Sequence, residues 1–133
     1  MNLNSTFKLV CFCLLSSTVM LSSSCKKDET PARDKFIGSY QVNENCTTGT
    51  YSYSLSIVEA ATSSDAVIIQ NFGNFASTIN VTATVSGDNL NFNATQDGVT
   101  ITGSGSINGN TLTIIYQAAG SFSDSCTSTC IKQ

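Results

Sequence analysis

Histidine and tryptophan are both absent from this chain of 133 residues, and charged residues make up only 11% of it. Without histidine, the chain can form neither a Ser-His or Cys-His catalytic pair nor a histidine metal site. Lys and Arg total only 6, and none lies between Phe36 and Ile131. Because nucleic-acid binding requires cations that displace phosphate counterions, we expect no nucleic-acid partner. The length suits one domain, for which we expect no enzymatic activity and no cofactor.

Residues 1–24 are typical of a signal peptide. One cation, Lys8, precedes an apolar run of 13 residues from Leu9 to Leu21, and small residues follow. A transmembrane helix needs about 20 apolar residues, so this run is too short for a permanent span. The segment is therefore predicted to direct export.

The run Leu21–Cys25, Leu-Ser-Ser-Ser-Cys, resembles a bacterial lipobox. The resemblance implies that Cys25 becomes the first residue of the mature protein and carries acyl chains such as palmitate. Two or more chains would hold the protein stably on a membrane. The alternative is a soluble secreted protein with an incidental cysteine.

Residues 25–35 are then expected to be a lipidated tether, because residues 26–31 offer no apolar side chain to bury. The lysines and acidic residues at 26–29 resemble the export signal of Bacteroidota lipoproteins. This resemblance implies an outer-membrane protein, anchored by lipid and exposed on the cell surface. A plain solvated linker is the alternative.

Residues 36–133 show a period of two, which predicts half-buried strands. Turn-forming residues separate the apolar and hydroxylic alternations, as at Asp97 and Gly98 and around Gly109. Short connections require antiparallel neighbours, so an all-β meander of about eight strands is expected. We predict that it closes as a small barrel, with a β-sandwich as the alternative. The expected strands are 36–45, 50–58, 65–70, 76–86, 89–95, 99–107, 111–117 and 122–132.

The segment Gly38-Ser39-Tyr40 resembles the first-strand motif of the small lipocalin-like lipoproteins of Bacteroidota. The resemblance implies a lipocalin-like barrel that takes a small apolar or amphipathic molecule. An eight-stranded barrel has an interior that either holds one small ligand or is filled by side chains. The inward set expected from strand parity is Phe36, Tyr40, Val42, Tyr53, Leu55, Val81, Phe92, Ile101, Ile114 and Tyr116.

Five residues are candidates for ligand binding. Glu44 shares the parity of Tyr40 and points inward if the first strand stays regular, whereas it faces water if the strand bulges near Asn43. An inward carboxylate at a barrel mouth could receive a polar ligand group. Buried phenol hydroxyls likewise need partners, which a ligand or water could supply. The candidates are Tyr40, Glu44, Tyr53, Phe92 and Tyr116.

Three cysteines remain in the exported domain, Cys46, Cys126 and Cys130, and an oxidising compartment favours one disulfide among them. Cys126 and Cys130 lie roughly 13 Å apart along a strand, beyond the reach of a disulfide. A register that pairs the first and last strands over their full length places Cys46 opposite Cys126. A bridge to Cys130 would require a shifted register. No fourth thiolate or histidine completes a metal site, so no metal is expected.

The polar strand faces, rich in Asn, Ser and Thr, support a different function. Rows of hydroxyls and amides could dock a glycan, although they also describe an ordinary solvated sheet. A non-catalytic interaction or glycan-capture module of the cell envelope is therefore the alternative to a ligand-binding barrel. In either case the chain is expected to be a monomer.

Overall fold

The computed structural model describes residues 30–75 and 79–133 of the chain. The predicted signal peptide, Cys25 and the residues at 26–29 lie outside the described part. No helix within the described residues is long and apolar enough to cross a membrane. Eight strands and two short 3-10 helices make up the fold: η1 (Ala32–Lys35), β1 (Gly38–Cys46), β2 (Gly49–Glu59), β3 (Ala66–Gln70), η2 (Phe72–Asn74), β4 (Asn80–Ser86), β5 (Asn89–Gln96), β6 (Val99–Asn108), β7 (Thr111–Gly120) and β8 (Asp124–Lys132).

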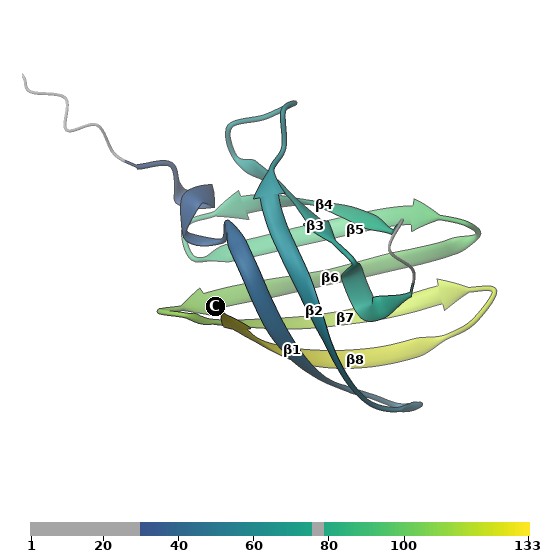
Figure 1. The fold of residues 1–133 in the computed structure, drawn as a ribbon. Helices are drawn as coiled ribbons and strands as arrows, with labels where there is room; N and C mark the ends of the chain where they lie inside the picture. Colours follow the sequence, from purple (N-terminus) through teal and green to yellow (C-terminus); the bar gives the residue numbers. More distant parts are fainter. Residues whose placement is uncertain (1–29, 76–78) are drawn as a thin grey trace, which may run out of the picture.

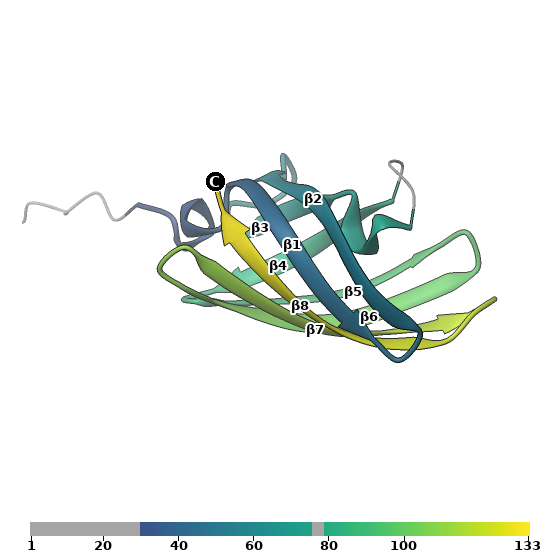
Figure 2. The ribbon, with the colours of Figure 1, turned by 60° about the horizontal axis from the view of Figure 1, so that its bottom comes forward.

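The strands form one antiparallel sheet in sequence order, which closes into a barrel when β1 pairs with β8 (Figures 1 and 2). The predicted meander and its closure as a barrel are confirmed, and the sandwich alternative is excluded. Closure removes the free sheet edges that would otherwise pair with other chains. The observed strand that departs most from its expected range is β4, which begins at Asn80 rather than at 76, and residues 76–78 lie outside the described part.

Hairpin turns fall where the sequence places residues that tolerate a positive φ. Asp97 and Gly98 have φ of 52° and 77°, and Gly87 and Gly109 have φ of 61° and 58°. Asp97 and Gly98 have the two successive positive φ values that a type I′ turn requires, whereas Gly87 and Gly109 are each the single positive-φ residue of their turns. These turns keep each strand beside the next and so produce the meander.

The barrel has two ends, which we name by their contents. At the terminal end, β1 begins and β8 finishes, and η1 lies beside them (Figure 1). At the disulfide end, the β1–β2 hairpin meets the β7–β8 connection, and η2 lies nearby (Figure 1). Arg33 of η1 donates hydrogen bonds to the carbonyl oxygens of Ala60 and Ser63, so η1 is attached to the β2–β3 connection.

The inward side chains fill the barrel as one hydrophobic cluster. All ten residues of the predicted inward set are buried. Gly103 of β6 makes room for this packing, because a Cβ there would lie 2.6 Å from both the Phe92 ring and the Tyr116 Cβ. The ring of Phe72 packs edge-on against Phe92 and Tyr116, with centroid distances of 5.2 and 4.8 Å. Aromatic side chains thus occupy the interior beneath the disulfide end.

Candidate functional site

A disulfide joins the first and last strands at the site. Cys46 and Cys126 are direct partners in the β1–β8 register, with a Cα–Cα distance of 4.0 Å and 80 residues between them in sequence. The predicted pairing is confirmed. Cys130 is a free, fully buried thiol, and burial, followed by the charge of Glu44, raises its pKa to about 12. A thiol held in this way is neutral and unreactive at physiological pH.

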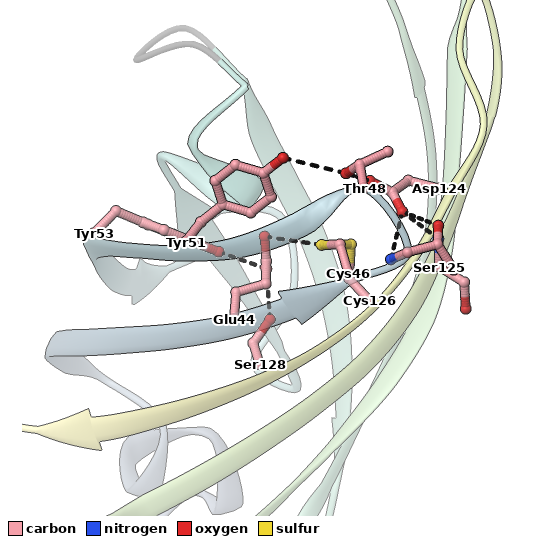
Figure 3. Close-up of a disulfide and its surroundings, with 10 residues drawn as sticks. Glu44, Cys46, Thr48, Tyr51, Tyr53, Asp124, Ser125, Cys126 and Ser128 are labelled. Carbon is pink, nitrogen blue, oxygen red and sulfur yellow. Dashed lines mark hydrogen bonds between the residues drawn. A yellow bond between two sulfur atoms is a disulfide. The ribbon is translucent and has the colours of Figure 1, made fainter.

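Glu44 is the buried carboxylate of the site, with only 1% of its surface exposed. The strand β1 stays regular through Cys46, so Glu44 points inward and the alternative of a bulge near Asn43 is wrong. Its Oε2 accepts hydrogen bonds from the hydroxyls of Tyr53 at 2.9 Å and Ser128 at 2.6 Å (Figure 3). Burying a carboxylate is costly unless it is hydrogen-bonded, and these donors reduce that cost.

The other carboxylate oxygen of Glu44, Oε1, accepts no such hydrogen bond. Glu44 Oε1 lies 3.5 Å from Cys46 Sγ, but a disulfide sulfur has no proton to donate. No described residue donates a hydrogen bond to Oε1 in the structure. Oε1 is therefore a buried acceptor without a hydrogen bond of ordinary geometry from the described residues.

Tyr116 carries a second unsatisfied group. Its hydroxyl is buried and makes no hydrogen bond of ordinary geometry with the described residues. Burial raises the pKa of this phenol, and the adjacent negative charge of Glu44 raises it further. The pKa of Tyr53 is raised by the same causes in the same order. Both phenols therefore stay protonated and able to donate.

A pocket of about 430 Å³ opens above Glu44 at the disulfide end. Its walls come from four segments, the end of β1, the start of β2, the η2 segment and the β7–β8 connection. Phe75 and Phe122 face each other with ring centroids 5.2 Å apart. The lining residues are Glu44, Cys46, Thr48, Tyr51, Gly73, Asn74, Phe75, Phe122 and Asp124.

The η2 segment places Phe75 in this wall. Asn71, Gly73 and Asn74 all have positive φ, between 53° and 62°, so the chain turns sharply there. A Cβ on Gly73 would lie within 3 Å of the Phe75 ring, which therefore folds directly over this glycine. The positive-φ residues of this loop thus produce the sharp turn, and Gly73 leaves the space that the Phe75 ring occupies.

Asp124 stands at the exposed rim of the pocket and is held by the β1–β2 hairpin. Its carboxylate accepts a hydrogen bond from the hydroxyl of Thr48 (Figure 3). It also accepts hydrogen bonds from the hydroxyl and the backbone amide of Thr47. The hydroxyl bonds from Thr47 and then Thr48 are the main causes that lower the pKa of Asp124. The rim therefore carries a fixed negative charge at neutral pH.

The five predicted ligand residues do not all lie in one place. Glu44, Tyr53 and Tyr116 lie together, but of the five only Glu44 lines the end pocket. Tyr40 lies nearer the terminal end, where its hydroxyl donates to the Phe36 carbonyl at 2.7 Å. Phe92 packs against Phe72 in the core.

Sequence reasoning missed Ser128 and the aromatic wall. Glu44 and Ser128 are direct partners in the register that places Cys46 opposite Cys126, so extending that register by two residues would have found Ser128. Phe75 and Phe122 lie in connections outside the strands, where no periodicity indicates which way a side chain points. Their place in the site comes from tertiary structure alone.

One cluster among the described residues has the chemistry of a metal site, with ligand atoms of Glu44, Cys46 and Cys126 within 4.8 Å of one another. The two sulfurs are bonded to each other and offer no thiolate. The oxidised protein therefore presents only the Glu44 carboxylate from this cluster.

Comparisons of the chain with protein-family models, curated proteins and solved structures found no match. The function proposed next rests on the fold and the chemistry of the site.

Proposed function

We propose that this protein is a lipid-anchored outer-membrane lipoprotein that binds a small amphipathic molecule in the pocket at the disulfide end of its barrel. It acts without catalysis and as a monomer. The proposed anchor rests on the lipobox at Cys25 and on the resemblance to lipocalin-like lipoproteins of Bacteroidota. The proposed binding site rests on the pocket.

The observation that carries the proposal is the combination of exposed aromatic rings and a buried carboxylate in one concave site. Tyr51 and Phe122 expose 43% and 41% of their surfaces, and both line the pocket. Exposed apolar side chains gathered in a concavity are typical of binding sites, and a few convergent polar groups fix a ligand's orientation. The apolar part of a ligand would contact the rings, and its polar part would meet Glu44.

The position of the pocket supports this role. The described chain begins at the terminal end of the barrel, beside η1 (Figure 1). The residues that line the pocket lie at the disulfide end. An anchor joined to the terminal end would leave the pocket facing away from the membrane. A ligand could then enter from the surrounding medium.

Native mass spectrometry tests the proposal. The full-length chain, released from bacterial membranes in an uncharged detergent, should carry a small-molecule adduct of defined mass. Phe122→Ala should reduce the adduct at least about tenfold, because it removes one wall of the pocket. Ile131→Ala is the matched control, since Ile131 is 40% exposed but lies on β8 away from the pocket. A wild-type protein without an adduct, or equal loss in both variants, would contradict the proposal.

A second candidate function is glycan binding on the outer face of β5, β6 and β7. A groove of about 480 Å³ lies there, lined by uncharged amide and hydroxyl side chains with Ile115, 57% exposed, at its edge. Neutral donors and acceptors beside one apolar contact suit a sugar ring. The lining residues are Ser86, Asn89, Asn91, Ser104, Gly105, Ser106, Thr113 and Ile115.

A glycan array probed with the full-length protein tests this candidate. Binding to a defined set of glycans, lost in Asn91→Ala and kept in Phe122→Ala, would assign the groove to glycans. Loss of glycan binding in Phe122→Ala alone would instead assign the glycan site to the end pocket.

A further inference from the structure

The cations of the described residues all lie at one end of the barrel, whereas carboxylates lie at both ends. The cations Arg33, Lys35 and Lys132 all lie at the terminal end, where β1 begins and β8 finishes. Each is engaged there: Arg33 with Glu59 at 3.0 Å, Lys35 with Asp88, and Lys132 Nζ with the Lys35 carbonyl at 3.1 Å.

The disulfide end holds carboxylates without a cation. Asp97 in the β5–β6 turn, Asp124 at the pocket rim and Glu44 beneath it all lie at this end, and no described Lys or Arg does. A concave site lined by charge of one sign, with apolar walls, concentrates ions of the opposite sign. The end pocket therefore favours positively charged molecules and repels anions.

The interior of the site lacks one charged partner. Glu44 is 1% exposed, yet only two neutral hydroxyls donate to it, both to Oε2, and Oε1 receives no hydrogen bond from the described residues. Buried carboxylates in proteins are normally paired with a cation. The hydroxyl of Tyr116, also buried and unpartnered, lies near the same carboxylate. The buried carboxylate is thus surrounded by neutral hydroxyls and has no cationic partner among the described residues.

The aromatic walls of the pocket suit the apolar part of a cationic ligand. Tyr51, Phe75 and Phe122 contribute three aromatic rings to the pocket, and the face of an aromatic ring attracts an organic cation. An ammonium group has N–H donors for Oε1 and a charge for the carboxylate, whereas a carboxylate or phosphate ligand would meet Glu44 and Asp124 with like charge.

From these observations we infer that the pocket at the disulfide end selects small organic cations, with Glu44 as the residue that binds the ammonium group and the aromatic rings as the residues that contact its apolar part. This inference rests on the proposed function, because it names the class of ligand for the same pocket. Ser128 and Tyr53 are positioning residues, since their hydrogen bonds hold Oε2 and leave Oε1 able to accept one from the ligand.

The test compares two probes of nearly equal shape, benzylamine, which is cationic at pH 7, and benzyl alcohol, which is neutral. Each is titrated into the full-length chain in uncharged detergent micelles, and the aromatic resonances of Phe75 and Phe122 report binding by NMR. We expect the cation to bind at least about tenfold more tightly than the alcohol. Phenylacetate, the anionic probe, should leave these resonances unchanged.

Variants assign the selectivity to one residue. Glu44→Gln should lower the affinity for benzylamine at least about tenfold and leave that for benzyl alcohol within about twofold, because the amide keeps the volume and removes the charge. Glu59→Gln is the matched control, since Glu59 lies at the terminal end, and it should change neither affinity. If Glu44→Gln does not fold, the comparison of the two probes on the wild-type chain decides alone.

Failure of this inference differs from failure of the proposed function. Equal binding of benzylamine and benzyl alcohol would overturn the selection of cations and leave an amphipathic pocket in place. Tighter binding of phenylacetate would overturn it as well. No change of the Phe75 and Phe122 resonances with any probe would overturn both the inference and the proposed function.

Discussion

Three buried tyrosines provide a matched set of substitutions, because each change to phenylalanine removes one hydroxyl and almost no volume. The hydroxyls differ in what they contact. Tyr53 donates to the Glu44 carboxylate at 2.9 Å, Tyr40 donates to the Phe36 carbonyl at 2.7 Å, and Tyr116 has no partner among the described residues. The structure therefore predicts three different effects on the free energy of unfolding.

The expected magnitudes follow from the partners. A hydrogen bond to a charged group contributes about 1.5–3 kcal/mol, so Tyr53→Phe should destabilise the fold by about 2 kcal/mol. A neutral hydrogen bond contributes about 0.5–1.5 kcal/mol, so Tyr40→Phe should cost about 1 kcal/mol. A buried hydroxyl without a partner opposes folding, so Tyr116→Phe should be neutral or stabilise by about 1 kcal/mol.

Urea unfolding of the oxidised protein, followed by circular dichroism, measures the series. With a urea dependence of about 2 kcal/mol per molar, Tyr53→Phe should lower the midpoint by about 1 M and Tyr116→Phe should leave it unchanged or raise it. Tyr51→Phe is a control on the surface, where the side chain is 43% exposed. A Tyr116→Phe variant as unstable as Tyr53→Phe would refute the reasoning, because it would mean that the Tyr116 hydroxyl has a partner in the folded protein.

Three further predictions concern the pH dependence of stability, the disulfide and the lipid anchor. Burial raises the pKa of Tyr40 and of Cys130 to about 12 each, from ordinary values of 10.0 and 9.0, so the unfolded chain releases their protons first. The free energy of unfolding should therefore keep its maximum value below pH 9 and decrease between pH 9 and 12. A urea midpoint that stays constant to pH 11 would contradict this prediction. Replacing both Cys46 and Cys126 by alanine should cost up to about 4 to 5 kcal/mol, because the bridge closes a loop of 80 residues; calorimetry of both proteins measures the loss, and an unchanged Tm would refute it. Labelled fatty acid should enter the wild-type chain in a bacterial host but not Cys25→Ala, and equal labelling of the two would exclude the proposed anchor.

The sequence by itself determined the strands, their faces and their order. Alternation of apolar and hydroxylic residues identifies the inward side of each strand, because successive side chains in a strand point to opposite faces. Turn residues such as Asp97 and Gly98 then make neighbours antiparallel. The pairing of Cys46 with Cys126 also followed from sequence, because only that register pairs the first and last strands along their length.

The tertiary structure decided what the site contains. Glu44 is buried only because β8 closes against β1 and brings Ser128, 84 residues away in sequence, to its carboxylate. Phe75 and Phe122 reach the pocket from connections whose direction depends on positive φ at Gly73 and on contacts across the barrel end. Local periodicity carries no information about such contacts, because they join segments that are distant in sequence and meet only when the barrel closes.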